Sequence, residues 1–269
     1  MHNEEYIIFD VETTGLSPAL GDRVIEIAAL KVKNFRPIEK FHSLVDPQRE
    51  ISYGAFLVNG IMQEMLDGAP LAKDVFPRFL EFAGSRCLVG HNIGFDLSFL
   101  NQELSLLGQK AVVSNAAIDT LKMARSLLPS LGSYSLWMVA QALGVGQKQR
   151  HRALEDVYMT FEVFERLMRC AKEKSLATPK TLLMLFGRTG AAHQAEIEEK
   201  MALIEEAIEE NKDLQLSYFS AGRVSITSRK VTPKKLTKGR SRATLVGYCY
   251  LREQEREFRI DRILQLQKL

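Results

Sequence analysis

The sequence predicts an α/β fold, a mixed sheet flanked by helices, followed by a smaller β domain. Strand-like runs at 6–11, 24–33 and 41–47 come first and look like a meander of neighbouring strands. Helical patterns then alternate with a further short apolar strand, which is typical of a mixed α/β domain. From residue 211 onward, short β-like runs separated by turns predict a small β-barrel or open sheet.

Periodic apolar residues support each helix of the first domain. We expect these helices at 73–83, 93–107, 118–128, 133–143 and 153–170, with an apolar strand at 86–92. Residues 171–192 are weakly patterned and read as a linker with a short helix at 180–186, and residues 193–210 form a strongly amphipathic helix. The predicted domains are therefore 1–170, a linker and helix at 171–210, and a basic β domain at 211–269.

The positive charge is concentrated near the end of the chain. The formal net charge is only +3, yet residues 211–269 carry 14 Lys and Arg against 5 Asp and Glu. A compact basic segment favours contact with a polyanion, usually nucleic acid. The stretch from Arg223 to Arg242 contains eight of these cations and no acid, although a solvated loop without a partner is the alternative.

Cysteine usage and hydropathy point to a cytoplasmic protein. Cys87, Cys170 and Cys249 lie far apart and form no CxxC pair, which disfavours a zinc site or a disulfide framework and fits a reducing compartment. The first residues show no cationic segment followed by an apolar run, so we expect no signal peptide. No apolar run approaches the roughly 18–20 residues of a membrane span, so we expect no membrane partner.

Two carboxylates stand out on the first strand. Asp10 and Glu12 are two residues apart, and because side chains alternate along a strand, both project to the same side. Ile7, Phe9 and Val11 then point into a core. Two carboxylates this close repel unless they are protonated or bridged by a cation, although a merely solvated strand end is the alternative.

Three more candidates lie further along the chain. Asp96 follows His91-Asn92 and falls in the first turn or so of a helix, where interaction with the helix dipole is the simpler explanation. His151 and Asp156 are five apart, so we expect His151 on the loop leading into a helix and Asp156 on its first turns. Taken alone, His151 reads more readily as an ordinary surface residue than as a catalyst.

Taken together, FDVETTG, HNIGFD about 80 residues later and HRALED about 55 further on resemble the three motifs of the DEDDh, or DnaQ-like, exonuclease family. VIEIAAL, VNGI (58–61), IDTLKMAR and SLWMVAQALG match in the same order, so the resemblance covers residues 5–169. It implies a ribonuclease-H-like fold and 3′→5′ exonuclease activity. It also implies roles for nine residues: Asp10, Glu12 and Asp156 as ligands of one divalent ion, Asp10 bridging to a second ion with Asp96 assisting through water, His151 as general base, and Thr13, Leu16, Asn92 and Phe95 as substrate-binding residues.

The implied chemistry suits these residue types. Two divalent ions assist phosphodiester hydrolysis by activating a water and by stabilising the leaving oxygen. Oxygen-only ligands favour Mg²⁺ or Mn²⁺ over zinc. An imidazole with an ordinary pKa near about 6.5 can accept the proton of the attacking water at physiological pH, which is worth roughly 10²–10⁴-fold in rate.

The final domain resembles a WYL domain, a small SH3-like β module. LQLSYFS (214–220), VTPKKL (231–236) and TLVGYCYLREQEREFRIDRI (244–263) carry the likeness, but Ala243-Thr244-Leu245 replaces the tripeptide that names the family. The resemblance implies binding of nucleic acid or a nucleotide through arginines. By position the candidates are Arg252, Arg256, Arg259 and Arg262, of which Arg259 and Arg262 could instead pair with Glu255, Glu257 or Asp261.

The hypothesis that follows is a 3′→5′ exonuclease that releases nucleoside 5′-monophosphates from DNA, preferring single-stranded or frayed ends, with two Mg²⁺ or Mn²⁺ ions and a C-terminal domain that aids binding. An exoribonuclease acting on short RNA is one alternative, because no residue that reads the 2′-OH is identifiable. A non-catalytic nucleic-acid sensor is another. The sequence does not favour proofreading over DNA repair or turnover, and it leaves protein partners unknown.

Overall fold

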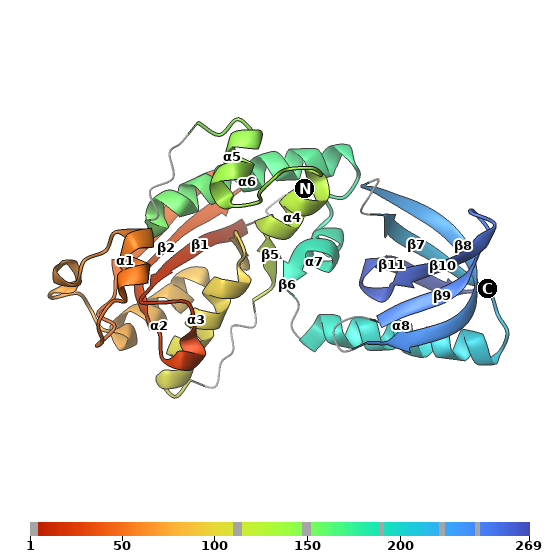
Figure 1. The fold of residues 1–269 in the computed structure, drawn as a ribbon, viewed down its shortest axis with the longest axis horizontal. Helices are drawn as coiled ribbons and strands as arrows, with labels where there is room; N and C mark the ends of the chain where they lie inside the picture. Colours follow the sequence, from red (N-terminus) through yellow and green to blue (C-terminus); the bar gives the residue numbers. More distant parts are fainter. Residues whose placement is uncertain (1–4, 110–114, 147–151, 189–190, 221–223, 240–242) are drawn as a thin grey trace. The chain divides into compact units, whose positions relative to one another are not determined.

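The computed structural model describes residues 5–109, 115–146, 152–188, 191–220, 224–239 and 243–269. The chain divides into two compact units, Met1–Cys170 and Ala171–Leu269 (Figure 1). Each unit has a sheet and an apolar core of its own. No helix within the described ranges is both long enough and apolar enough to cross a membrane.

The first unit is built on a mixed sheet with the strand order β3-β2-β1-β4-β5. Its strands are β1 (Glu5–Thr13), β2 (Val24–Lys33), β3 (Arg36–Leu44), β4 (Cys87–Gly90) and β5 (Ala117–Asp119). The meander β1-β2-β3 is antiparallel, whereas β1 pairs parallel with β4, and β4 with β5. The mixed sheet and the order of elements confirm the predicted fold class.

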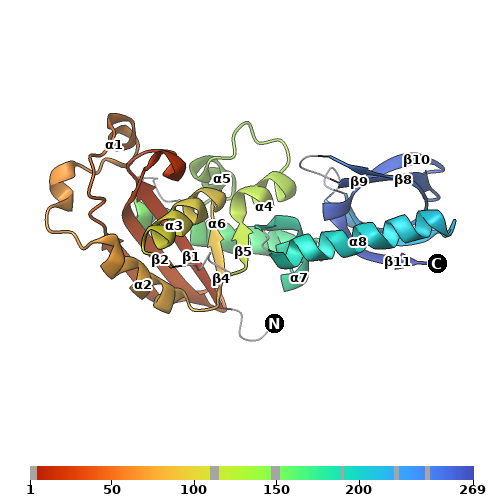
Figure 2. The same cartoon turned by 90° about the horizontal axis from the view of Figure 1, so that it is seen from below.

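Helices cover both faces of this sheet (Figures 1 and 2). They are α1 (Tyr53–Asn59), α2 (Ala72–Ala83), α3 (Gly94–Leu106), α4 (Thr120–Leu127), α5 (Leu136–Ala142) and α6 (Ala153–Glu173), with single 3₁₀ turns η1 (Pro18–Leu20) and η2 (Gln63–Leu66). Helices α2 and α3 lie on the face opposite α6.

The alternation of side chains along β1 assigns each residue to a face. Ile7, Phe9 and Val11 are at most 4% exposed and join the core formed with α2 and α3, as the sequence predicts. The side chain of Tyr6 points the other way, and its ring lies edge-on to Phe164 of α6, with 5.1 Å between the ring centroids. Residues at even positions of β1 therefore face α6.

Two element boundaries and one additional helix differ from the prediction. The helix expected at 118–128 starts only at Thr120, because residues 117–119 form the short strand β5 and the Asp119 carboxylate caps α4 by accepting from the backbone N–H of Leu121 at 2.9 Å. The third strand begins at Arg36 and not at residue 41. Helix α1 was not predicted, since its seven residues show no amphipathic period; Ser52 caps it.

The second unit contains two helices and an antiparallel sheet with the strand order β10-β9-β8-β7-β11. Its elements are α7 (Pro179–Phe186), β6 (Gly187–Arg188), α8 (Ala191–Glu209), β7 (Leu214–Ser220), β8 (Ser225–Lys238), β9 (Ala243–Cys249), β10 (Gln254–Arg259), the 3₁₀ turn η4 (Ile260–Arg262) and β11 (Ile263–Lys268). Strand β8 passes through Pro233, where its register against β9 shifts, since proline cannot donate to the ladder.

Helix α8 is part of the second unit's core. Ile204 and Ala207 are fully buried among apolar residues of the sheet, and α8 contacts β8 and β11. The buried Lys200 amine donates to the backbone oxygen of Ile263 at 2.7 Å and pairs with Glu196 at 3.2 Å. The segment 171–210, which the sequence set apart as a linker and helix, thus contributes to this unit.

Removing a core side chain from α8 tests this assignment. We expect Ile204→Ala to lower the free energy of unfolding of the second unit by about 2–5 kcal/mol, because it opens a cavity in a packed core. Amide hydrogen exchange in β7 and β8 should accelerate, with β1 and β2 unaffected. Glu209→Ala, on the exposed side of α8, is the control. Equal exchange in the two variants would mean that α8 is only a connector.

Candidate active site

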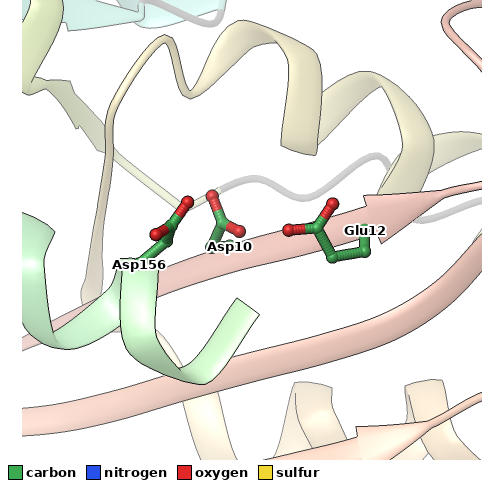
Figure 3. A group of neighbouring side chains, drawn as sticks. All are labelled: Asp10, Glu12 and Asp156. Carbon is green, nitrogen blue, oxygen red and sulfur yellow. The ribbon is translucent and has the colours of Figure 1, made fainter. Parts of the chain in front are cut away.

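Three carboxylates meet where β1 passes under the start of α6. One oxygen from each of Asp10, Glu12 and Asp156 lies within 4.8 Å of the others (Figure 3). Asp10 and Glu12 share the face of β1 that is turned to α6, and Asp156 lies in the first turn of that helix. A strand period of two and the first turn of a helix therefore bring together residues that are 146 apart, counted from Asp10 to Asp156.

Asp96 reaches the same region from the other side of β1. Strand β4 pairs with β1 only as far as Ile8, so the chain beyond β4 is free to turn into α3. The buried Asp96 carboxylate accepts from the backbone N–H of Val11 at 3.2 Å, between Asp10 and Glu12. Beyond the end of the parallel pairing, the Asp96 carboxylate therefore accepts a hydrogen bond from β1 in place of a backbone oxygen of β4. The sequence predicted a buried apolar stripe along this helix, and it is confirmed, because all four of its residues are buried: Ile93, Leu97, Leu100 and Leu104.

Proton affinity in this cluster is high. Burial, followed by the charges of Asp96, Glu12 and Asp156, raises the pKa of Asp10 well above its ordinary value. Burial, and then the charge of Asp156, raises the pKa of Glu12 to about 8, and burial raises that of Asp96 to about 7. Each carboxyl resists ionisation because it is buried, and Asp10 and Glu12 also because like charges surround them. A divalent cation bound there can replace the protons.

Glu26 is a further buried acid beside the cluster, opposite Glu12 in the register of β1 and β2. Burial alone would raise its pKa, but hydrogen bonds from Arg152 and His42 outweigh that effect and hold the pKa of Glu26 below its ordinary value. Glu26 is therefore ionised under conditions in which Glu12 still holds its proton. The sequence reasoning did not single out Glu26, because VIEIAAL reads as a strand and its arginine partner is 126 residues away.

The predicted substrate-binding residues follow β1 and β4. The hydroxyl of Thr13 donates to the backbone oxygen of Gly15 at 2.6 Å, and the exposed Asn92 adopts a positive φ while its N–H donates to Asp119 at 3.0 Å. Phe95 is half-buried, with its ring centroid 4.9 Å from that of Phe99. Leu16 is 86% exposed at the tip of the β1–β2 loop.

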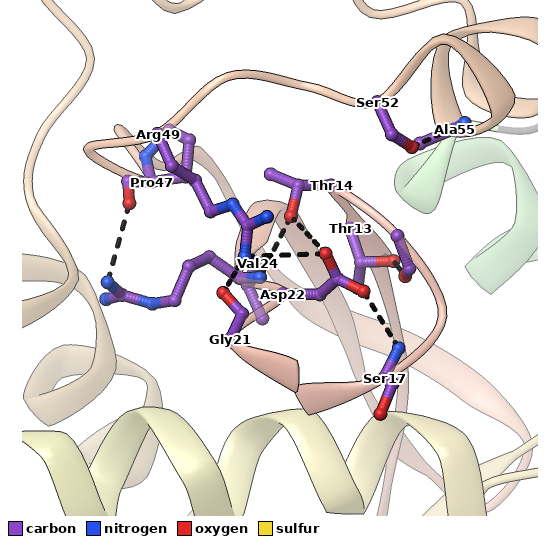
Figure 4. A network of polar contacts seen from close by, with 12 residues as sticks. Thr13, Thr14, Ser17, Gly21, Asp22, Val24, Pro47, Arg49, Ser52 and Ala55 are labelled. Carbon is purple, nitrogen blue, oxygen red and sulfur yellow. Dashed lines mark hydrogen bonds and ion pairs between the residues drawn. The ribbon is translucent and has the colours of Figure 1, made fainter. Parts of the chain in front are cut away.

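A polar network holds that loop in shape (Figure 4). The Asp22 carboxylate accepts from the backbone N–H of Ser17 at 3.0 Å and from the Thr14 hydroxyl at 3.3 Å, and it pairs with Arg49 at 3.5 Å. A Cβ at Gly15 would overlap this carboxylate, so a larger residue there would displace Asp22 from the network. The loop that carries Leu16 is therefore ordered by its own side chains and by Arg49.

Exposed apolar side chains gather on this loop and on the neighbouring helix α1. The loop joins the start of α1 through the N–H of Ser52, which donates to Thr14 O at 3.2 Å, and the end of α1 through the Asn59 amide, which donates to Thr13 O at 3.3 Å. The loop, α1 and the residues after α1 carry six large apolar residues that are at least half exposed. These are Leu16, Leu20, Tyr53, Leu57, Val58 and Met62. Of these residues, only Leu16 was predicted from the sequence to bind substrate, and Val58 lies in the VNGI match.

His151 lies outside the described residues, so its role stays a prediction. The described chain resumes at Arg152, directly before α6, and Arg152 is bound to Glu26 through two hydrogen bonds of 2.9 and 2.8 Å. Asp156 lies one helical turn further on, on the buried side with Ala153 and Thr160, as expected from the sequence.

The four candidate arginines of the second unit differ in their surroundings. Arg259 is bound to Asp261, with 2.9 Å between Nε and Oδ1. This is one of the acidic partners that the sequence analysis gave as an alternative to ligand binding. Arg252 and Arg256 are exposed on the β9–β10 turn and on β10, with no ion pair among the described residues. Arg262 is half-buried in η4. Three lysines of the basic stretch are paired with acids: Lys230 with Asp213, Lys234 with Glu255 and Lys238 with Glu205.

Comparison with known families gives two matches. The RNase T family model, described as Exonuclease, matches residues 7–164, and the WYL domain model matches residues 199–268. The DNA polymerase III of PolC type from Caldanaerobacter subterraneus subsp. tengcongensis is 39% identical over 183 residues, which are 67% of this chain and 13% of that protein. The corresponding Bacillus subtilis protein is 36% identical over 191 residues, 71% of this chain and 13% of that protein. The chain thus spans a small part of these relatives.

Two solved structures share the fold of the first unit. Exonuclease X in complex with 5′ overhanging duplex DNA is 26% identical, with a TM-score of 0.54 over 67% of this chain and 98% of that one. The nuclease domain of 3′hExo, a DEDDh family member bound to rAMP, is 18% identical, with a TM-score of 0.55 over 62% of this chain and 92% of that one, and shows the fold alone. The chain belongs to the RNase T family of exonucleases and carries a WYL domain after its exonuclease domain.

Proposed function

We propose that the chain is a 3′→5′ exonuclease of the DEDDh type that hydrolyses phosphodiester bonds at the 3′ end of DNA and releases nucleoside 5′-monophosphates. The observation that carries the proposal is the convergence of Asp10, Glu12 and Asp156 within 4.8 Å at one end of β1. The relatives named DNA polymerase III and the Exonuclease X complex with duplex DNA favour DNA over RNA as the substrate.

The donor set fits divalent cations. All three groups offer hard carboxylate oxygens, which suit Mg²⁺ or Mn²⁺. Burial and the neighbouring carboxylates raise the pKa values of Asp10 and Glu12, so a bound cation would favour their ionised forms. Asp10, Glu12 and Asp156 would hold one ion, and Asp10 would share a second with Asp96 acting through water. Two such ions, when bound, activate the attacking water and stabilise the leaving oxygen.

The remaining roles fall to residues around the carboxylates. His151 acts as general base and takes the proton of the attacking water. The backbone at Thr13, together with Asn92 and Phe95, borders the sugar and base of the terminal nucleotide. Leu16 packs against the terminal base, and the exposed apolar residues of α1 extend this contact, because a nucleobase offers an apolar face that covers them.

The basic residues of the WYL domain aid binding of the nucleic-acid strand. Lys230, Lys234 and Lys238 are each paired with an acid, so their charge is partly compensated. Arg252 and Arg256 are exposed and are the better candidates for contacts with phosphate. The absence of acids from the sequence between Arg223 and Arg242 therefore overstates the free positive charge of that stretch, and the binding is assigned to the two arginines.

Digestion of end-labelled strands tests the direction and the substrate. With 5′-labelled single-stranded DNA and Mg²⁺ we expect a ladder that shortens from the 3′ end, with RNA of the same sequence cut more slowly. Asp10→Asn should lower the rate by at least about 10³-fold, since metal assistance is worth several kcal/mol. Asp74→Asn, an exposed acid on α2, should leave the rate unchanged. Products that shorten from the 5′ end, or a ladder equally strong for Asp10→Asn, would refute the proposal.

The raised pKa of Glu12 gives a pH dependence with a defined sign. Without metal, the folded protein keeps a proton on Glu12 up to about pH 8, whereas the unfolded chain loses it near its ordinary pKa. The contribution of Glu12 to stability is therefore present at low pH and lost as pH rises through about 5 to 8. We expect Mg²⁺ to raise Tm more at about pH 8.5 than at about pH 5.5, because binding needs the ionised carboxylates.

Thermal melting with and without Mg²⁺ at both pH values is the measurement, with Glu12→Gln as the control. In that variant the metal-dependent rise in Tm should be small and nearly independent of pH. A rise that is the same at both pH values in the wild type would contradict the assignment of Glu12 as a metal ligand.

Salt dependence tests the role of the WYL domain. We expect Arg252→Ala combined with Arg256→Ala to weaken binding of single-stranded DNA and to reduce the slope of log K against log salt by about 1.4, since each lost phosphate contact removes about 0.7. Fluorescence anisotropy in EDTA measures binding without hydrolysis. Arg169→Ala, an exposed arginine of α6, is the control. An unchanged slope in the double variant would remove these arginines from the interface.

A further inference from the structure

Glu26 is bound on both carboxylate oxygens by groups that belong to the start of α6. Arg152 Nε donates to Oε2 at 2.9 Å and Arg152 Nη2 to Oε1 at 2.8 Å, and the backbone N–H of Ala153 donates to Oε2 at 3.2 Å. His42 Nε2 lies 2.7 Å from Oε1 on the β3 side. The Glu26 carboxylate is 1% exposed, whereas the side chains of Arg152 and His42 remain partly exposed.

The same contacts continue to Asp156. The backbone N–H of Asp156 donates to the backbone oxygen of Arg152 at 3.0 Å, which closes the first turn of α6. On the sheet side, Glu26 lies opposite Glu12 in the register of β1 and β2. Glu26 therefore connects β2, which pairs with the strand of Asp10 and Glu12, to the helical turn that carries Asp156.

We propose that Glu26 and Arg152 are a positioning pair that fixes the first turn of α6 so that Asp156 meets Asp10 and Glu12. The expected effect of this pair on metal affinity rests on the proposed function. Its expected effect on the stability of the first turn of α6 does not. Groups that orient ligands without touching the ion commonly affect metal affinity by about 10- to 100-fold. The pair would have this effect although neither residue belongs to the carboxylate cluster.

A direct role of Glu26 as a further metal ligand makes a different prediction. Its oxygens already accept from Arg152, Ala153 and His42, which leaves an ion to compete with a bidentate guanidinium. Removing Arg152 would free the carboxylate and increase metal affinity if Glu26 were a ligand. It would decrease metal affinity if the pair positions Asp156.

Glu103 provides a matched control within the same unit. It is also 1% exposed, accepts from both Arg23 Nε at 2.8 Å and Arg23 Nη2 at 2.7 Å, and accepts from a backbone N–H, that of Val24, at 3.0 Å. Glu103→Gln therefore removes the same kind of buried bidentate pair as Glu26→Gln, but not at α6. Any general cost of losing such a pair appears in both variants.

The experiment compares Glu26→Gln, Arg152→Met, their combination and Glu103→Gln in the full chain. Hydrogen exchange without metal is the first readout: we expect the amides of the first turn of α6 to exchange about tenfold faster in Glu26→Gln, because one hydrogen bond and the salt bridge are lost. Glu103→Gln should leave this turn unchanged. Calorimetric titration with Mn²⁺ is the second readout, and Glu26→Gln and Arg152→Met should each bind about 10- to 100-fold more weakly.

The combined variant should bind Mn²⁺ no more weakly than the poorer single variant, since both changes break the same contact. Unchanged exchange at α6 in Glu26→Gln overturns the inference, as does Mn²⁺ affinity equal to that of Glu103→Gln. A gain in affinity in Arg152→Met overturns it in favour of a ligand role. If Asp10→Asn binds Mn²⁺ as well as the wild type does, the proposed function fails instead, and the exchange readout still tests the positioning pair.

Discussion

Electrostatic repulsion among Asp10, Glu12 and Asp156 is the constraint around which the first unit is organised. Three carboxylates within 4.8 Å, partly withdrawn from water, destabilise a folded protein unless protons or cations neutralise them. The pKa of Glu12 is raised first by burial and then by the charge of Asp156, so part of its shift reflects this repulsion. The rest of the unit has to be rigid enough to hold them together, and a well-packed sheet between two layers of helices provides that rigidity.

Apolar packing and buried polar contacts together position β1 and the start of α6. Ile7, Phe9 and Val11 fix β1 against α2 and α3, and this leaves the opposite face of the strand to the carboxylates. Asp96 holds the strand edge through the N–H of Val11, and Glu26 holds the start of α6. Glu26 and the cluster show how environment divides buried acids: one with hydrogen-bonded cationic partners stays charged, whereas those surrounded by other carboxylates resist ionisation.

Local patterns were sufficient to predict most of this arrangement. The apolar period of β1, the motif spacing and the long helix from Ala153 placed Asp10, Glu12 and Asp156 correctly on their elements. Short elements were harder: β5 has three residues and merged with the helix after it, and α1 lacks an apolar stripe because its large side chains face solvent. Contacts distant in sequence, such as Arg152 with Glu26 and Lys234 with Glu255, leave no local signal. The run of cations without a nearby acid therefore exaggerated the free positive charge of residues 223–242.

The central claim is that the acidic cluster seats divalent cations, and anomalous X-ray scattering from crystals containing Mn²⁺ tests it most directly. The account predicts at least one strong anomalous peak within about 2.5 Å of oxygens from Asp10, Glu12 and Asp156 together. No peak at the cluster, at a Mn²⁺ concentration that supports digestion of DNA, would contradict it, as would peaks bound only by acids on other surfaces.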